Sequence, residues 1–189
     1  QQIFQTLDLS SPFHIVFWAA CLIAFFSFLR KSNLFCGHSS HPNAFLRRKD
    51  VTFLKQGATL HIRHSKTIQY GDRVLLIPIP HIPRSYLCPT TTLLLAYKSV
   101  AAPPDAPLLS YPTPGGPKTL SYQTFISRLK AVLTHLGFDA SEYAGHSFRR
   151  GGARLALSCN LPADLIKLQG DWRSDCYQRY LEPDLSTKF

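Results

Sequence analysis

The chain has 189 residues, 45% of them hydrophobic and 13 of them phenylalanine, so it is long and apolar enough to build its own core. This composition excludes an intrinsically disordered chain and predicts one globular domain. Lys and Arg number 21 against 11 acidic residues, and the formal charge of +10 favours a polyanionic partner, with nucleic acid first and an anionic membrane surface second.

The first predicted element is a helix with Ser11 as N-cap and Pro12 as its first residue. It runs to about Arg30 or Ser32, and residues 1–10 before it are predicted to be a linker or an arm leading into the domain. Residues 13–29 are apolar almost throughout, which is typical of either a buried helix or a membrane anchor. We favour the buried helix, because the run is slightly short for a span and nothing else in the chain looks membranous.

Arg30 comes at the predicted end of this helix, where an arginine is either a partner of the helix dipole or a residue of a functional site. Taken alone, its position favours the dipole role. Residues 35–49 are predicted to form a loop that ends in the basic cluster Arg47-Arg48-Lys49, for which a solvated face is the expected outcome. Three short strand-like runs follow and predict a small antiparallel meander, at 51–55, 59–64 and 73–79. Lys66 then lies at the tip of the second hairpin.

The second half of the chain is predicted to be mainly helical. Residues 101–118 contain six of the 14 prolines and are predicted to be a loop. Helices are predicted at 90–100, from Ser121 to Gly137, at 149–158 and at 160–170, with a final short helix that contains Tyr177 and Tyr180. The predicted fold class is α+β, a mainly helical domain with a small three-stranded antiparallel sheet.

The five cysteines are odd in number and widely spaced, and they contain no Cys-x-x-Cys pair. This pattern predicts reduced thiols in an intracellular compartment rather than a disulfide framework or a zinc ribbon. Cys36, His38 and His41 lie close together in the sequence. A fourth metal ligand is not evident there, so a polar loop is the favoured interpretation.

One stretch, residues 145–153, carries the strongest chemical signal. His146 and Arg149 are three residues apart, which places them on one face of a helix. An imidazole exchanges a proton near neutral pH, and a guanidinium presents a fixed fork of donors to phosphate oxygens. The pair predicts either half of a phosphoryl-transfer site or a basic helix start with a hydrogen-bonded histidine. Gly151 and Gly152 follow and would let the backbone approach a neighbour closely.

Other residues along the chain favour the site over the helix start. In order, they lie in Phe28-Leu29-Arg30-Lys31-Ser32, His64-Ser65-Lys66-Thr67, His146-Ser147-Phe148-Arg149 and Gly170-Asp171-Trp172, followed by Tyr180. These segments contain six residues whose order resembles the catalytic domain of tyrosine recombinases, the phage-integrase family. The six residues are Arg30, Lys66, His146, Arg149, Trp172 and Tyr180. The resemblance covers the chain from about Ser11 onward, and the ending Gly-Asp-Trp-x-Ser-Asp looks closest to recombinases of eukaryotic mobile elements.

The resemblance implies an enzyme that breaks and rejoins double-stranded DNA through a 3′-phosphotyrosine intermediate. Arg30 and Arg149 would hold the scissile phosphate, since preorganised cations stabilise the charge that develops on its oxygens. The indole N–H of Trp172 would be a further donor. His146 would assist proton transfer near the nucleophile Tyr180, because a free phenol ionises only near a pH of about 10.

The resemblance also gives Lys66 the task of protonating the departing 5′ oxygen. It implies no metal and no other cofactor, in agreement with the lack of a carboxylate cluster in the sequence. The implied partners are DNA and further copies of the chain, as a dimer or tetramer on DNA. The implied location is intracellular and DNA-associated, in the nucleus if the source is eukaryotic.

Three departures from the family pattern accompany the resemblance. The family often has an acidic residue three positions after the first arginine, where this chain has Asn33. The gap from Trp172 to Tyr180 is one residue shorter than usual, so Tyr177 competes for the nucleophile role, although spacing favours Tyr180. The N-terminal DNA-clamping domain has no counterpart, so residues 11–189 are predicted to be a catalytic domain alone.

Several alternatives remain open from the sequence. A type IB topoisomerase uses similar residues, but typically has histidine where Trp172 stands. A catalytically inactive DNA-binding protein could retain the fold and the basic surface, although every expected site residue is present. A membrane-anchored protein would leave the later motifs unexplained. Arg150 is either a second DNA contact or a surface charge.

Overall fold

The structure is a computed structural model that describes residues 1–37, 45–65, 68, 73–174 and 178. Its helices are α1 (Gln2–Gln5), α2 (Pro12–Ser27), α3 (Lys31–Leu34), α4 (Pro89–Lys98), α5 (Tyr122–His135), α6 (Gly145–Ser158) and α7 (Ala163–Gln169), with short 3₁₀ helices η1 (Arg48–Asp50) and η2 (Ala140–Glu142). Its strands are β1 (Val51–Leu54), β2 (Gly57–Ile62), β3 (Leu75–Pro80), β4 (Ser110–Thr113) and β5 (Gly116–Thr119). The predicted fold class, mainly helical α+β with a three-stranded antiparallel sheet, is confirmed.

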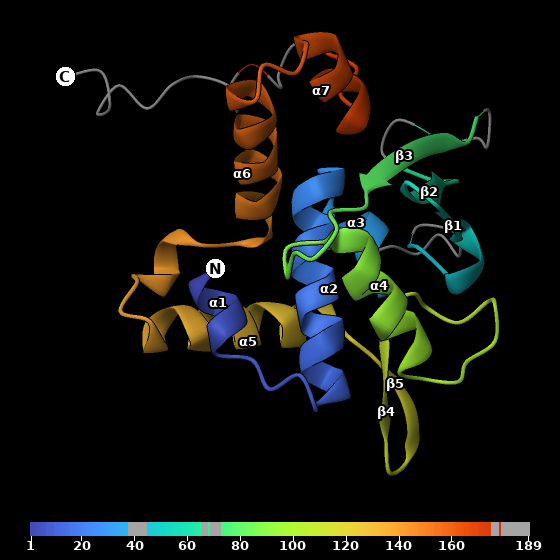
Figure 1. The fold of residues 1–189 in the computed structure, drawn as a ribbon, viewed down its shortest axis with the longest axis vertical. Coiled ribbons are helices and arrows are strands. Elements are labelled where there is room, and N and C mark those ends of the chain that lie inside the picture. The colour runs from blue at the N-terminus through green and yellow to red at the C-terminus, as the bar shows by residue number, and fades with distance from the viewer. Residues whose placement is uncertain (38–44, 66–67, 69–72, 175–177, 179–189) are drawn as a thin grey trace.

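Helix α2 is the centre of the molecule. It runs between α6 on one side and the β1–β2–β3 sheet with α4 on the other (Figure 1). Its residues from Val16 to Ala24 are all buried, because neighbours cover the helix on every side. This all-round burial explains the uninterrupted apolar run in the sequence. No helix in the described part of the chain has the length and apolarity needed to span a membrane.

The three-stranded sheet has β2 in the middle, paired antiparallel with β1 and β3. Along β3, Leu75, Ile77 and Ile79 are buried and alternate with exposed residues, as expected for a strand with one face on the core. The register pairs Ile62 with Leu75, so the chain beyond this pair leads out of the sheet. Ser65 and Ile68 then bond to each other through both backbone N–H groups, at 3.1 Å each.

The end of α2 differs from the prediction. The helix stops at Ser27, and Phe28 adopts a left-handed conformation with φ of 51°. The Ser27 hydroxyl donates to the Ile23 carbonyl at 2.5 Å, and Phe28 turns into a second small core with Trp172. Arg30 is therefore the N-cap residue of α3 and not the last residue of the buried helix. The Arg30 guanidinium hydrogen-bonds to Asp171, so in the structure its partner is a carboxylate rather than the end of the buried helix.

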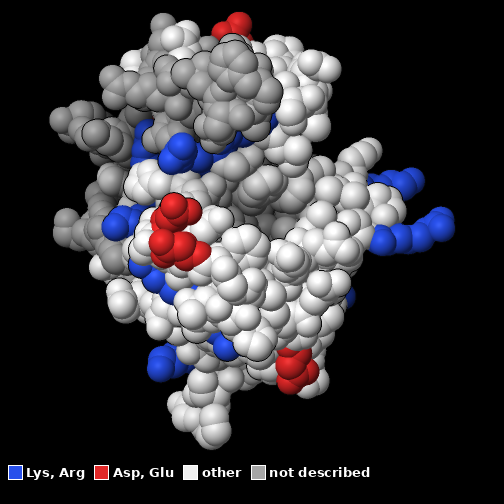
Figure 2. All heavy atoms as spheres, turned by 90° about the vertical axis from the view of Figure 1, so that its left-hand side faces the viewer, with Lys and Arg blue, Asp and Glu red and all other residues white. Residues whose placement is uncertain are grey.

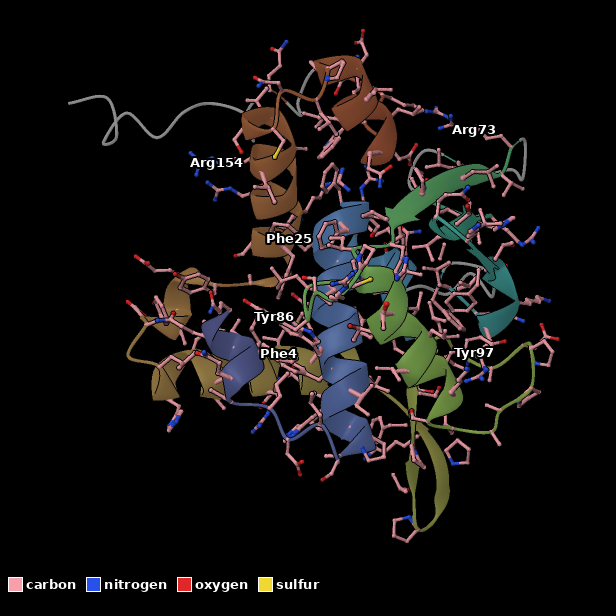
Figure 3. All side chains as sticks on the ribbon, in the orientation of Figure 1. Phe4, Phe25, Arg73, Tyr86, Tyr97 and Arg154 are labelled. Atoms are coloured by element: carbon pink, nitrogen blue, oxygen red, sulfur yellow. The ribbon has the colours of Figure 1, made fainter. Side chains whose placement is uncertain are left out.

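Two segments predicted to lack regular structure contain it. Residues 1–10 include α1, where the Phe4 ring lies 5.5 Å from the Trp18 ring and 4.7 Å from the Tyr86 ring (Figure 3). Residues 101–118 contain most of the β4–β5 hairpin, in which Pro112 and Pro117 face each other. Prolines suggested a loop because they weaken a sheet, but an isolated two-stranded hairpin has no central strand to disrupt.

The basic cluster is also less solvated than predicted. Arg48 is buried, whereas Arg47 and Lys49 both form ion pairs with Asp105, at 3.1 Å and 2.5 Å. Backbone bonds from Arg48 and Lys49 to the carbonyls of Ala106 and Pro104 hold η1 against the proline-rich segment. The proline-rich segment therefore covers part of the basic cluster. The local sequence around the cluster gives no sign of this contact.

Candidate active site

Arg149 lies on α6, whose start is held by hydrogen bonds from the Ala144 N–H to the Ser147 hydroxyl and from the Gly145 N–H to the Tyr122 hydroxyl. Only 4% of Arg149 is exposed. Its guanidinium donates through Nη1 to the Phe28 carbonyl and through Nη2 to the Gly170 carbonyl, the latter at 2.7 Å. Arg149 thus joins the end of α2 to the end of α7.

The Arg149 guanidinium also stacks on the Trp172 ring, 3.9 Å from the ring centre. Trp172 belongs to a small buried core with Phe28, Ala153 and Ile166, separate from the main core around α2. A cation over an indole face is stabilised by the ring quadrupole, more strongly where water is excluded. In this arrangement the Trp172 ring supports the position of Arg149.

Gly152 allows α6 to approach α2 closely, as the sequence predicted. A Cβ at Gly152 would lie 2.0 Å from the Phe25 carbonyl oxygen and 2.6 Å from a ring carbon of Phe28. Phe25 lies on α2 where this helix faces α6 (Figure 3). Any side chain at Gly152 would push α6, and Arg149 with it, away from the end of α2.

Asp171 is the centre of the polar part of the site. It follows α7 in a left-handed conformation with φ of 51°, which Asp tolerates better than most residues. Its carboxylate accepts hydrogen bonds from the Ser65 hydroxyl at 2.7 Å, from Arg73 at 2.9 Å and from Arg30 at 3.5 Å. Arg30 also donates to the Asp171 backbone carbonyl at 3.4 Å. Three segments that are distant in the sequence therefore meet at one carboxylate.

The cations of this cluster differ in their access to solvent. The side chain of Arg73 is 43% exposed and that of Arg30 is 26% exposed, whereas Asp171 is 7% exposed. Arg73 lies at the start of β3 on the side toward α7 (Figure 3). Arg30, Arg73 and Arg149 together exceed the single negative charge of Asp171, so the site has a net positive charge. Partly exposed arginines in such a site can meet an incoming anion.

The structure brings together three of the six predicted site residues, namely Arg30, Arg149 and Trp172. His146 lies on α6 as predicted, but it is exposed whereas Arg149 is buried, so the pair does not share an environment. Lys66 and Tyr180, with the competing Tyr177, lie outside the described residues. Ser65, which precedes Lys66, is part of the cluster through its bond to Asp171.

Sequence reasoning missed three residues of the cluster: Ser65, Arg73 and Asp171. Asp171 belongs to the Gly-Asp-Trp motif and Ser65 directly precedes Lys66. Nothing in the local sequence at either position indicates that the Asp171 carboxylate bonds to Ser65. Asn33 has a role of its own, because its side-chain N–H donates to the His64 carbonyl at 2.7 Å. The Leu46 N–H donates to the Asn33 carbonyl at 2.8 Å, so Asn33 ties α3 both to the chain beyond β2 and to the segment before η1.

The described residues contain no group of three or more His, Cys, Asp or Glu side chains that could hold a metal ion. Cys36 is among these residues, but the other two members of the sequence cluster, His38 and His41, are not. Cys21 and Cys88 are buried and are not in a disulfide. Burial among apolar side chains raises the pKa of the Cys21 thiol above its usual range, which makes it unreactive.

The architecture resembles that of solved recombinases. The structure of the XerH site-specific recombinase bound to difH substrate, a pre-cleavage complex, matches with a TM-score of 0.68 and 15% sequence identity over 98% of this chain and 47% of the other. A post-cleavage complex of XerH with palindromic difH matches with a TM-score of 0.65 and 15% identity, over 95% and 45% of the two chains.

The fold is similar to that of about half of the XerH recombinase chain. This chain spans less than half the length of the XerH chains that it matches. No protein-family model and no curated protein sequence matches it. The narrower resemblance to recombinases of eukaryotic mobile elements stays a prediction from the Gly-Asp-Trp-x-Ser-Asp motif.

Proposed function

We propose that this chain is the catalytic domain of a tyrosine recombinase, which breaks and rejoins DNA strands through a 3′-phosphotyrosine intermediate. One observation carries the proposal: Arg30 and Arg149, from opposite halves of the sequence, converge on residues 170–172 in a recombinase fold. A site with arginines from separate segments suits a phosphodiester, because several fixed cations can stabilise charge on its non-bridging oxygens at once.

Of the two arginines proposed to hold the phosphate, Arg30 is better placed than Arg149 to contact it directly, because the side chain of Arg30 is 26% exposed and Arg149 is buried. Arg149 lies behind it, held by two backbone carbonyls and the Trp172 ring. A guanidinium has five N–H donors, so two carbonyl bonds do not exhaust its capacity to bind a phosphate oxygen. Tyr180 would attack the phosphorus, and the 5′ oxygen would leave as the bond to the tyrosine oxygen forms.

Proton transfer completes this chemistry. The attacking phenol must lose its proton, and His146, exposed on the first turn of α6, is the proposed acceptor. The departing 5′ oxygen must gain a proton, and Lys66 is the proposed donor. The rejoining step reverses both transfers, with a 5′ hydroxyl attacking the phosphotyrosine bond. The bond energy of the broken strand is thus kept in the covalent intermediate, and no cofactor is required.

The proposed partner is double-stranded DNA, bound with further copies of the chain. The formal charge of +10 favours a polyanion. Figure 2 shows one face of the molecule, on which Lys and Arg atoms extend from both flanks while Asp and Glu atoms gather in small separate groups. Arg154 points away from α2 on α6 (Figure 3), so it can contact a partner without disturbing the core.

A second candidate function, a DNA-binding protein without strand-breaking activity, has one observation in its favour. Arg149 already bonds two carbonyls at the ends of α2 and α7, and this role would retain it without any catalysis. Such a protein would bind DNA with an affinity that falls steeply as salt concentration rises, because phosphate contacts release counterions. It would form no covalent bond to DNA.

Capture of the covalent intermediate distinguishes the two functions. The probe is a pool of duplexes of randomised sequence, each with a nick beside the central phosphates so that the released strand end diffuses away. We expect the wild-type protein to form an adduct that survives denaturation, Tyr180→Phe to abolish it and Tyr177→Phe to retain it. Loss of the adduct in Tyr177→Phe alone would reassign the nucleophile. Salt-dependent binding without any adduct would support the binding function instead.

A further inference from the structure

The Asp171 carboxylate hydrogen-bonds to three segments at the proposed site. It accepts from Arg30 at the start of α3, from Ser65 beyond β2 and from Arg73 before β3. Its chain neighbours Gly170 and Trp172 both contact Arg149. A shift of this one side chain would therefore move several site groups relative to each other.

The charges explain why a carboxylate is needed at this point. Arg30 and Arg73 each lie within 3.5 Å of an oxygen of the same carboxylate, Oδ2 for Arg30 and Oδ1 for Arg73. Two guanidinium groups this close to one another repel unless an anion lies between them. Asp171 is nearly buried, so water screens this repulsion poorly and the carboxylate provides the compensation.

Asn33 makes the role of Asp171 more specific. The position three residues after Arg30 has no charge in this chain, and the Asn33 side chain donates to the His64 carbonyl. The carboxylate in contact with Arg30 comes instead from the other end of the chain, through Asp171. The acidic support that the sequence appeared to lack is therefore present in space.

We propose that Asp171 is a positioning residue that sets the guanidinium of Arg30 for phosphate binding and holds Ser65 and Arg73 in place beside it. This proposal rests on the proposed function. Asp171 does not touch DNA in this role: it acts through the residues it contacts. Its removal should therefore slow strand cleavage much more than it weakens DNA binding.

The test is Asp171→Asn, which keeps the shape of the side chain and removes its charge. Asn tolerates the left-handed backbone as readily as Asp, so the substitution adds no strain there. We expect the single-turnover rate of adduct formation on the nicked duplexes to fall about 100-fold, as for a misplaced catalytic group. DNA affinity should stay within about threefold of wild type, because the positive groups remain.

The matched control is Asp105→Asn. Asp105 also joins two cations, Arg47 and Lys49, but it is 63% exposed, and no hydrogen bond or ion pair links it to a described residue of the site. This variant should cleave at the wild-type rate. Equal slowing in both variants would overturn the proposal, because a general change of charge would then explain the effect. Cleavage at the wild-type rate by a folded Asp171→Asn variant would also overturn it.

Two further measurements cover other outcomes. Ser65→Ala removes one hydrogen bond to Asp171 and leaves both of its ion pairs in place. We expect cleavage to slow about tenfold, as for the loss of one hydrogen bond to a charged group. NMR of the arginine side chains reports positioning without activity: rotation of the Arg30 and Arg73 guanidinium groups should be faster in Asp171→Asn than in wild type and unchanged in Asp105→Asn. If rotation of these guanidinium groups is the same in Asp171→Asn as in wild type, the proposal for Asp171 is overturned, even in a protein that forms no adduct. If the wild-type protein forms no adduct, that result counts against the proposed function instead.

Discussion

Arg149 and Arg48 have similar surroundings in two different regions of the molecule. Both are buried, and each guanidinium stacks on an aromatic ring, at 3.9 Å from Trp172 and 3.6 Å from Tyr97. Each also donates to a backbone carbonyl, from Nη2 of Arg149 to Gly170 and from Nη2 of Arg48 to Tyr97. Burial on an aromatic ring therefore does not by itself identify a catalytic arginine.

The difference between the regions lies in how completely each guanidinium is hydrogen-bonded and in what surrounds it. Arg149 bonds a second carbonyl, that of Phe28, whereas Nε and Nη1 of Arg48 have no hydrogen-bond partner in the part of the chain that the structure describes. In the region of Arg149, the predicted site residue Arg30 contacts Asp171, and Asp171 is nearly buried. Near Arg48, the bridging Asp105 is exposed.

What marks the site is the convergence of several segments and not any single residue. Arg48 anchors η1 to α4, a role that needs bulk and one hydrogen bond (Figure 3 shows Tyr97 on α4). Arg149 joins α2, α6 and α7 at the place where Arg30 meets Asp171. Substitutions in the two regions should therefore differ in their effects on both stability and cleavage.

The largest difference is expected between Arg149→Met and Arg48→Met. Arg149→Met leaves two buried carbonyls without donors and should lower the free energy of unfolding by about 3 kcal/mol. Strand cleavage should fall about 100- to 1000-fold, as for loss of one donor to a developing oxyanion. The measurements are urea denaturation and single-turnover adduct formation.

Arg48→Met should behave differently, because it removes two buried donors that have no hydrogen-bond partner among the described residues. Replacing a poorly satisfied buried charge by an apolar side chain of similar volume is often close to neutral, and only the Tyr97 carbonyl loses its donor, so we expect a loss of about 1 kcal/mol, smaller than for Arg149→Met. Cleavage by the folded variant should be unchanged. Equal losses of stability and cleavage in the two variants would contradict the distinction between the regions.

The next effect concerns the contact of α6 with α2, which only the Arg149 region has. Gly152→Ala places a Cβ 2.0 Å from the Phe25 carbonyl oxygen, and backbone movement to relieve this overlap should cost about 2 kcal/mol. Cleavage should also fall, because Arg149 moves with α6. Thermal unfolding and adduct formation measure the two effects.

Gly151→Ala is the matched control for this contact. A Cβ at Gly151 would lie 3.2 Å from a ring carbon of Phe25, a side chain that can shift slightly. Replacing glycine by alanine inside a helix also gains about 0.5–1 kcal/mol. We therefore expect Gly151→Ala to be neutral or slightly stabilising. A protein more destabilised by Gly151→Ala than by Gly152→Ala would show that the helices pack differently.

The smallest effect is expected at Asp105 and depends on pH. Hydrogen bonds from Lys49, and then from Arg47, hold the pKa of Asp105 below its usual range. A carboxyl group whose pKa is lower in the folded state stabilises the fold above its unfolded pKa, and this contribution is lost as pH falls through the folded pKa.

Asp105→Asn should therefore lower the thermal midpoint slightly at pH 7. The difference from wild type should disappear as pH falls below the usual aspartate pKa of about 3.9 and then below the folded value. Because Asp105 is exposed and its ion pairs are screened by solvent, added salt should also reduce the difference. A large or salt-independent loss would mean that the Arg48 region depends on this carboxylate as strongly as the site depends on Asp171.

Much of the fold could be predicted from local patterns. The apolar run predicted the central helix α2, alternation predicted the three strands, and Ser121 predicted the start of α5, where its hydroxyl accepts from the Thr124 N–H at 3.0 Å. Patterns failed where packing between distant segments decides the outcome, at the end of α2 and in residues 101–118. Phe28 leaves the helix to pack with Trp172, a partner that no local window contains.

The sequence by itself determined the types of residue that could form the site and their order, because His-x-x-Arg and Gly-Asp-Trp are contiguous motifs. Only the tertiary structure decided which of these residues meet, that Arg149 is buried while His146 is exposed, and that Asp171 joins Arg30, Arg73 and Ser65. The physical reason is that a carboxylate is oriented by charges from segments far apart in the chain. Their distances depend on how α2, α6, α7 and the sheet pack together.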